Sequence, residues 1–214
     1  MMMMAFVAAL GLSSCSETDD TVEEFPDWQK KNESFFLSKY TMASSSTSGE
    51  WKIIKTYARN ESAQVKPTDH IVVKVLREGT GSGCPLFTDS VRVHYRGTLL
   101  ASATHVDDND PELGYVFDKS WTSDVFNEQI SVPAKFAVSN LVDGFATAVQ
   151  HMHIGDRWLV YIPYQLGYGT TATSSGAIPA YSTLVFDVAL AAYYRAGTKV
   201  PDWQATENLL WEAE

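Results

Sequence analysis

The sequence predicts an α+β fold in which a twisted antiparallel β-sheet wraps around one short α-helix, with helical extensions at both ends of the chain. Apolar side chains at Val91, Val93 and Tyr95 alternate with polar ones, and residues 184–190 repeat this alternation. A period of two is typical of a strand that buries one face. A second pattern, with the period of a helix, occupies residues 145–152, and this helix would cover the buried face of the sheet.

Two shorter β-rich runs come before the first alternating strand, at residues 51–57 and 71–76. The second run leads into a glycine-rich turn at residues 79–83. Runs of β-branched and aromatic residues that end in turn residues are typical of strands. Both runs are therefore expected to pair with the sheet or to extend it.

The predicted helix presents four apolar side chains on one face, at Phe145, Ala148, Val149 and Met152. An apolar strand at residues 158–162 follows, so the helix is expected to pack against a sheet. Asp143 is the expected N-cap, because a carboxylate there accepts hydrogen bonds from unpaired backbone N–H groups and suits the positive end of the helix dipole. The aromatic ring in the first turn and the later Tyr168 favour an apolar pocket with one polar group, although the same residues would also serve as plain core.

The first 12 residues are apolar but too few for an ordinary transmembrane helix, and the sequence Leu12-Ser13-Ser14-Cys15 closes this run. It resembles the lipobox of bacterial lipoproteins, and the acidic residues that follow resemble a surface-export signal of some Bacteroidetes lipoproteins. The resemblance implies a signal peptide at residues 1–14, lipidation at Cys15, and an outer-membrane lipoprotein of the cell envelope that is periplasmic or surface-exposed. Because no Lys or Arg precedes the apolar run, an apolar arm with a chance cysteine is the alternative.

The remainder of the chain is expected to have three parts. Residues 15–65 hold an acidic tether, a short capped amphipathic helix before about Tyr40, and a linker that includes the serine-rich residues 42–49. The main domain occupies residues 66–194. Residues 195–214 are expected to form a helical tail.

The sequence Pro-Asp-Trp-Gln occurs at residues 26–29 and again at residues 201–204. Each copy is followed by apolar residues, so two similar helix starts are expected to flank the main domain. The two segments either cover the sheet of the domain or present aromatic anchors to a partner.

Composition narrows the class of protein. With 214 residues, 45% of them hydrophobic, the chain can bury one sizeable core and carry appendages. The formal net charge of −10 disfavours a nucleic acid partner, because phosphates attract basic surfaces.

Other sites that carry chemistry are not favoured by the sequence. His151 and His153 lie near the end of the predicted helix without a third ligand nearby, so a polar helix end is favoured over a metal site. Neither a metal nor a cofactor is expected. Cys84 is the only thiol besides Cys15, so no disulfide is expected once Cys15 is lipidated. A Gly-x-Ser-x-Gly motif is absent from the sequence, which disfavours a serine hydrolase of that type.

Four segments carry a family resemblance when they are read in order. They are residues 91–99, 116–120, 140–168 and 178–188, with the sequences VRVHYRGTL, VFDKS, NLVDGFATAVQHMHIGDRWLVYIPYQLGY and IPAYSTLVFDV. Together they resemble the FKBP-type peptidyl-prolyl cis-trans isomerases. The resemblance implies the FKBP-like fold and isomerisation of the peptide bond before proline in extracytoplasmic proteins, with proline-containing polypeptides as substrates and macrolides as further ligands.

The resemblance also implies a hydrophobic cleft. Its implied catalytic residues are Phe117, Asp118 and Tyr168, and its implied substrate-binding residues are Tyr95, Leu141, Val142, Phe145, Ile178 and Phe186. The Tyr168 hydroxyl and the Val142 backbone N–H would hold substrate carbonyl groups, and Asp118 would orient or polarise the rim. Because a twisted X–Pro amide has less charge separation than a planar one, a dry apolar wall favours it without a nucleophile or a metal.

Departures from the family pattern leave a second hypothesis open. Ala134 stands where an aromatic wall is expected, and no Arg follows Asp118 within several residues. Phe145 stands where many members carry Trp, although its ring would still fill the same space. The alternative function is a catalytically weak binding module, or a chaperone subunit of an envelope complex.

Overall fold

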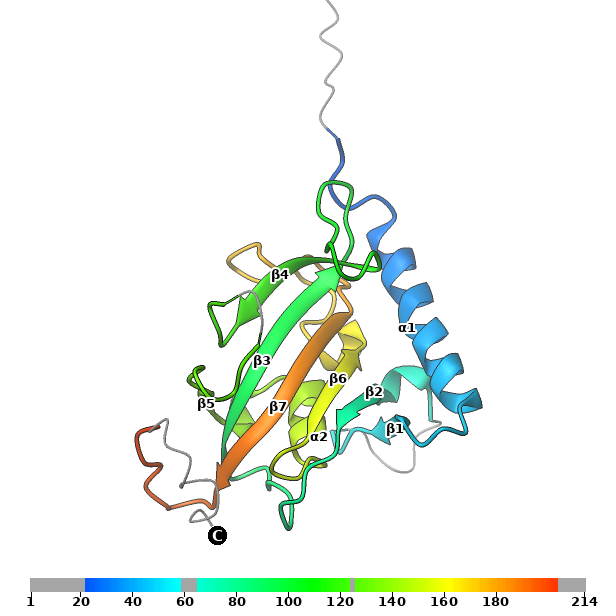
Figure 1. Ribbon diagram of the computed structural model, residues 1–214. Coiled ribbons are helices and arrows are strands. Elements are labelled where there is room, and N and C mark those ends of the chain that lie inside the picture. Colours follow the sequence, from blue (N-terminus) through cyan, green and yellow to red (C-terminus); the bar gives the residue numbers. More distant parts are fainter. Residues whose placement is uncertain (1–21, 59–64, 124–125, 204–214) are drawn as a thin grey trace, which may run out of the picture.

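The computed structural model describes residues 22–58, 65–123 and 126–203. These residues form one seven-stranded antiparallel sheet and two α-helices, with three short 3₁₀-helices (Figure 1). The α-helices are α1 (Trp28–Ser45) and α2 (Asp143–Val149), and the strands are β1 (Trp51–Lys55), β2 (His70–Arg77), β3 (Ser90–Leu100), β4 (Leu113–Lys119), β5 (Ala134–Ala137), β6 (Arg157–Ile162) and β7 (Leu184–Tyr194). The 3₁₀-helices are η1 (Pro67–Asp69), η2 (Val138–Asn140) and η3 (Tyr164–Leu166). The predicted fold class is confirmed.

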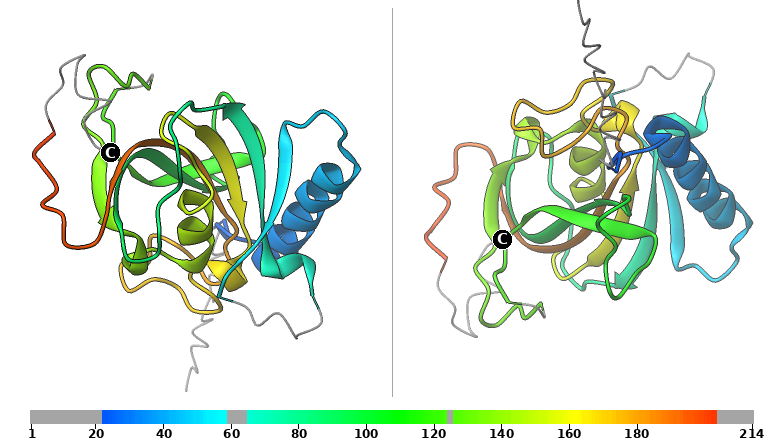
Figure 2. Two further views of the ribbon diagram at one scale, coloured as in Figure 1. Left: turned by 90° about the horizontal axis from the view of Figure 1, so that it is seen from below. Right: turned by 90° about the horizontal axis from the view of Figure 1, so that it is seen from above.

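Strand β7, the last strand among the described residues, lies near the centre of the sheet. The strand order is β1-β2-β6-β7-β3-β4, and β5 pairs with β3 as well. Figure 2 shows the sheet curving around α2, whereas α1 lies outside the sheet beside β1 and β2. The molecule therefore has one helix on each side of the sheet.

The side of the sheet that faces α2, called the inner face here, holds the main core. Because successive side chains along a strand point to opposite faces, Ile71, Val160 and Leu184 all point to this side. There they belong to one buried cluster with the α2 residue Phe145. Phe145 is 2% exposed, and Met152 just after the helix is fully buried. The predicted helix face is therefore the face that packs against the sheet.

Helix α2 starts at Asp143 itself. Val142 occupies the N-cap position, and no side-chain capping hydrogen bond forms, so the prediction that Asp143 caps the helix is wrong. Its carboxylate still lies in the first turn, where the helix dipole favours negative charge. Gly144 comes next and lets the helix approach the sheet closely, because a Cβ at this position would lie 2.3 Å from Cγ2 of Ile162.

The opposite side of the sheet, called the outer face here, is partly covered by α1. A second, smaller core forms between the sheet and this helix, and it includes Val72, Tyr161, Val185, Phe36 and Ala43. The predicted helix before about Tyr40 is confirmed, but it continues to Ser45, because Ala43 is buried against the sheet. Part of the predicted linker is therefore helical. The N-cap residue, Asp27, makes no side-chain capping hydrogen bond.

The repeated Pro-Asp-Trp sequence packs against the domain at both of its occurrences. Trp28 is 8% exposed and belongs to the inner-face core. Trp203 lies beside Arg92 of β3, whose guanidinium carbon is 5.8 Å from the ring centre and whose Nη2 donates to the carbonyl oxygen of Pro201 at 2.6 Å. Of the two alternatives for this repeat, these contacts support covering the domain.

Several predictions about the chain ends fall on residues whose structure is not described. Residues 1–14, Cys15 and most of the predicted helical tail lie outside the described ranges. The part of the tail that is described, residues 195–203, contains no helix. Within the described ranges, no helix combines the length and the hydropathy needed to cross a membrane.

Candidate active site

Five aromatic rings meet on the inner face, and this group is called the aromatic cluster here. It consists of Tyr95 on β3, Phe117 on β4, Phe136 on β5, Phe145 on α2 and Phe186 on β7. The ring centres of Phe145 and Phe186 are 4.8 Å apart, and those of Phe117 and Phe186 are 5.5 Å apart. Both pairs are nearly perpendicular, which sets the positive edge of one ring against the negative face of the other.

Gly97 provides the space for two of these rings. It pairs with Phe186 across the β3–β7 ladder. A Cβ at this position would lie 2.5 Å from Cζ of Phe117 and 2.7 Å from Cε1 of Phe186, which is too close for either ring. A larger residue here would push the two rings out of the cluster.

Exposure increases from the centre of the site to its edge. Phe145 and Phe186 are 2% and 6% exposed, Phe117 is half-buried, and Tyr168 is 46% exposed. The buried rings are held rigidly by the core, whereas the outer residues remain open to solvent. This gradient gives an apolar surface with a polar edge, which is the usual composition of a ligand-binding site.

Tyr95 links the aromatic cluster to a carboxylate. Its hydroxyl donates a hydrogen bond of 2.6 Å to Oδ2 of Asp118, which is itself exposed. Burial raises the pKa of Tyr95 strongly, the hydrogen bond to Asp118 and its charge raise it further, and Tyr168 contributes in the same direction. The phenol therefore stays protonated and donating, and it fixes the orientation of the carboxylate at the edge of the cluster.

The remaining residues of the predicted cleft lie around the same core. Leu141 and Val142, just before α2, are half-buried and pack against it, and Ile178 is 5% exposed within it. Tyr168, just after η3, is 46% exposed, and its contribution to the raised pKa of Tyr95 is the smallest of the causes. The structure therefore gathers the predicted residues other than Tyr168 on the inner face of one sheet, with Asp118 at the edge.

The aromatic cluster contains one ring that the sequence analysis did not include, Phe136. Its centre is 5.6 Å from that of Tyr95. Phe136 and Ala134 pair with Val91 and Val93 of β3, so both face the inner core. The signal was present in the alternation of Ala-Lys-Phe-Ala, which puts an aromatic ring on the same face as Ala134, two residues farther along the strand.

The histidines at the end of α2 take part in local hydrogen bonding. Nδ1 of His151 is 2.8 Å from the carbonyl oxygen of Thr147, and the His151 ring stacks on Tyr57 with 5.1 Å between ring centres. The contact with a carbonyl of the last helical turn is the role expected for a polar helix end. Across the described residues, no group of three His, Cys, Asp or Glu side chains is placed to hold a metal ion.

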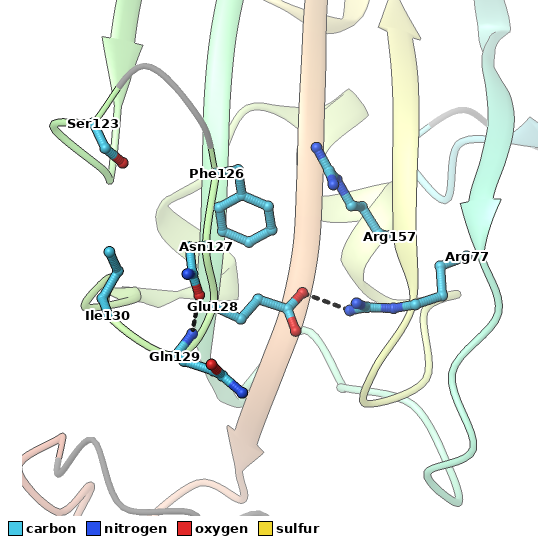
Figure 3. A pocket seen from close by; sticks show the side chains of 8 residues that line it. All are labelled: Arg77, Ser123, Phe126, Asn127, Glu128, Gln129, Ile130 and Arg157. Carbon is cyan, nitrogen blue, oxygen red and sulfur yellow. Dashed lines mark hydrogen bonds and ion pairs between the residues drawn. The ribbon is translucent and has the colours of Figure 1, made fainter.

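The outer face carries an open groove of a different kind, with a volume of about 580 Å³ (Figure 3). Two arginines line it, and both are paired. Arg77 Nη2 lies 2.5 Å from Glu128 Oε1, and Arg157 binds both carboxylate oxygens of Asp187 at 2.9 and 2.6 Å. The guanidinium of Arg157 also lies 4.7 Å from the ring centre of Phe126. Because these charges are already compensated, the groove is a weaker candidate for the active site than the aromatic cluster.

Comparison with known proteins assigns the family. The model of the family "FKBP-type peptidyl-prolyl cis-trans isomerase" matches residues 85–191. The macrophage infectivity potentiator of Trypanosoma cruzi is 31% identical over 166 residues, which cover 76% of this chain and 74% of that protein. The outer membrane protein MIP of Legionella longbeachae is 32% identical over 123 residues, 58% of this chain and 44% of the relative. This chain therefore spans less than half the length of the Legionella protein.

Solved structures agree on the fold. The crystal structure of FkpA from Escherichia coli superposes with a TM-score of 0.53 at 24% identity, over 78% of this chain and 62% of that one. A likeness at this level of identity supports the fold alone. Together, the family match and the T. cruzi relative show that this chain belongs to the FKBP-type peptidyl-prolyl cis-trans isomerase family.

Proposed function

We propose that this chain catalyses cis-trans isomerisation of X–Pro peptide bonds at the aromatic cluster, in substrates that are proline-containing polypeptides of the cell envelope. The observation that carries the proposal is the aromatic cluster, with the Tyr95–Asp118 hydrogen bond at its edge, in a member of this family. Rotation about an X–Pro bond must cross a barrier of roughly 20 kcal/mol, because the twisted amide loses its resonance.

The proposed mechanism uses the polarity of the surface rather than a reacting group. The twisted amide is less polar than the planar one, so a water-poor wall formed by Phe117, Phe145 and Phe186 stabilises it relative to the ground state. The Tyr168 hydroxyl and the Val142 backbone N–H hold the substrate carbonyls on either side of the bond. Tyr95, Leu141 and Ile178 complete the proposed binding surface, and Asp118, oriented by Tyr95, sets the charge at the rim.

The activity is tested with the chain that begins at Ser16, on a Leu-Pro peptide whose cis-to-trans conversion is followed by a protease-coupled assay. We expect acceleration above the uncatalysed rate and competition by macrolide ligands of the family. Folded protein, verified by circular dichroism, that leaves the rate unchanged would refute the isomerase proposal. Retained peptide binding in that case would favour the alternative of a binding module, which the small side chain of Ala134 first suggested.

We further infer that the protein is a lipoprotein of the cell envelope, anchored through Cys15. The inference is supported by the sequence Leu12-Ser13-Ser14-Cys15 and by the name of the Legionella relative, outer membrane protein MIP. The several acyl chains of a bacterial lipoprotein anchor a protein stably, whereas one chain gives only marginal binding.

This localisation is tested by fractionating cells that express Cys15→Ala, with Cys84→Ala as the matched control. We expect the first variant to leave the membrane fraction and the second to remain there. Unacylated wild-type protein in the soluble fraction, identified by intact mass, would contradict the anchor.

A further inference from the structure

Two residues of α1 make hydrogen bonds to the end of one loop. Trp28 Nε1 donates to Ser182 Oγ at 2.9 Å, and Asn32 Oδ1 accepts from the Thr183 backbone N–H at 2.7 Å. Thr183 Oγ1 also donates to the backbone carbonyl of Asn32 at 3.2 Å. These bonds fix the last residues before β7, in a loop that spans residues 164–183 and is called the η3–β7 loop here.

A third residue of α1 holds the other end of the same loop. The Tyr164 hydroxyl donates to Oε1 of Glu33 at 3.2 Å, and the Tyr164 ring packs on that of Tyr181 with 5.2 Å between centres. The Tyr181 backbone N–H then donates to the carbonyl of Gly169 at 3.0 Å. The helix therefore contacts both ends of the η3–β7 loop, and an internal hydrogen bond joins the two ends.

One residue of the η3–β7 loop has a strained backbone conformation that neighbouring residues must stabilise. Tyr181 has φ of 63°, in the left-handed region that side chains other than glycine rarely adopt. Such a conformation persists only where the surroundings determine it. Ser182 and Thr183, which are the residues bonded to α1, follow it directly.

The η3–β7 loop carries two residues of the proposed site, Tyr168 and Ile178. Gly169, whose carbonyl accepts from Tyr181, follows Tyr168 directly, and Ile178 is buried in the same core cluster as Trp28. Asn32 has no exposed surface, so its amide is committed to these internal bonds. The loop that forms one wall of the site is thus held by a helix that lies outside residues 85–191, the part of the chain that matches the family model.

We propose that Trp28 and Asn32 are positioning residues for the active site, which place Tyr168 and Ile178 against the substrate through Ser182 and Thr183. This inference rests on the proposed function. It gives the first turns of α1, which hold Trp28 and Asn32, a positioning role for the site and an effect on substrate selection. Ile178 is the apolar member of this wall. If its side chain contacts the residue before proline, a loosened loop loses more contact with a large residue there than with a small one.

The test compares Trp28→Phe, Asn32→Leu and the wild type in the chain that begins at Ser16. Trp28→Phe keeps an aromatic ring and removes the donor to Ser182, and Asn32→Leu removes the acceptor for Thr183. For each protein, kcat/KM is measured with Leu-Pro and Ala-Pro peptides, and the Kd of the Leu-Pro peptide is measured by NMR titration. We expect the Leu-Pro to Ala-Pro ratio of kcat/KM to fall roughly two- to tenfold, the equivalent of one hydrogen bond.

Two controls separate positioning from general stability. Lys39→Met removes the ion pair of α1 with Glu112 of the β3–β4 loop, without touching the η3–β7 loop, and should leave the ratio unchanged. Ser182→Ala removes the acceptor for Trp28 and also the bond that Ser182 Oγ donates to the Pro179 carbonyl at 2.8 Å, so its effect should be at least as large as that of Trp28→Phe. Adding Trp28→Phe to Ser182→Ala should cause no further change, because the bond between the two side chains is already lost.

The outcomes are distinguishable. A ratio that stays at the wild-type value in Trp28→Phe and Asn32→Leu, with unchanged Kd, overturns the positioning role while the wild-type rate still supports the proposed function. A wild-type protein that binds the peptide without turning it over refutes the isomerase proposal, and a weaker Kd in the two variants then supports the positioning role on its own. A wild-type protein that neither binds nor turns over the peptide overturns both.

Discussion

His94 and Tyr95 are neighbours in β3, and they show how differently the two faces of the sheet are built. Tyr95 points into the aromatic cluster and bonds to Asp118, whereas His94 lies on the outer face with its ring centre 5.1 Å from that of Phe126. Burial is the main cause of both pKa shifts, and it raises the pKa of Tyr95 and lowers that of His94. Both side chains are thereby kept neutral, one as a donor at the site and the other as a part of the packing.

The two faces of the sheet also differ in how their charged side chains are paired. On the outer face, Arg77 pairs with Glu128 and Arg157 with Asp187, so each cation faces its own anion. On the inner face, the Asp118 carboxylate accepts a hydrogen bond from a neutral phenol at the edge of an apolar surface. A substrate with polar carbonyls and an apolar proline ring is therefore better matched to the inner face than to the charged groove of the outer face.

The largest expected effect comes from removing one ring on each face. Phe145→Ala should lower the free energy of unfolding by about 3 kcal/mol, because the ring is fully packed in the core, and it should abolish turnover. The matched variant on the outer face, Phe126→Ala, should cost less, since Phe126 is only half-buried, and should keep its turnover. Urea denaturation and the Leu-Pro assay give both quantities. An unchanged denaturation midpoint for Phe145→Ala would show that the inner face is not the core described here.

A smaller effect is expected from one hydroxyl at the edge of the site. Tyr168→Phe removes a proposed bond to a substrate carbonyl and should lower kcat/KM by an amount equivalent to about 0.5–1.5 kcal/mol, with little change in stability, because Tyr168 is 46% exposed. Tyr115→Phe is the control, since Tyr115 is equally exposed at 44% but is not part of the proposed site. Equal rates for the two variants would argue against a substrate bond to Tyr168.

The smallest effect concerns the outer face and depends on pH. Because burial lowers the pKa of His94 from its ordinary value of 6.5, the unfolded chain takes up a proton here at a pH where the folded chain does not. The free energy of unfolding should therefore be highest above pH 6.5 and fall as the pH drops toward the folded-state pKa. His94→Gln should show a weaker dependence over the same range, measured by urea denaturation from pH 8 to pH 5. Parallel curves for the two proteins would contradict a neutral His94 in the folded state.

The parts of the fold that the sequence predicted are those with a local period. Strands β3 and β7 each alternate over many residues, and α2 repeats its apolar face before an apolar strand, so burial on one side could be read from spacing alone. The predicted start of α2 was wrong. A carboxylate before glycine suits both the N-cap and the first helical position, and only the backbone conformation distinguishes the two positions.

The parts that the sequence did not predict depend on contacts between distant elements. Tyr161 and Val185 lie on the outer sides of β6 and β7, and their spacing does not show which of the two expected flanking helices covers them. The candidate site was predicted almost entirely through the family resemblance, and its missing ring, Phe136, sits in a strand of only four residues, too short for its alternation to stand out. The role of Asn32 depends on a bond across 151 positions of sequence, which no local pattern encodes.

The central place of β7 in the sheet has a consequence for how the chain folds. This strand joins β6 to β3, and it is the last strand among the described residues, so the two halves of the sheet cannot be connected until residue 194 is available. The hydrogen bond between Trp28 and Ser182 joins residues 154 positions apart, so this contact of α1 can form only after residue 182 is available. Pairings of such long range are slow to form. During synthesis from the N-terminus, the sheet should therefore remain open until β7 has been released, and truncation before β7 should leave no partly active domain.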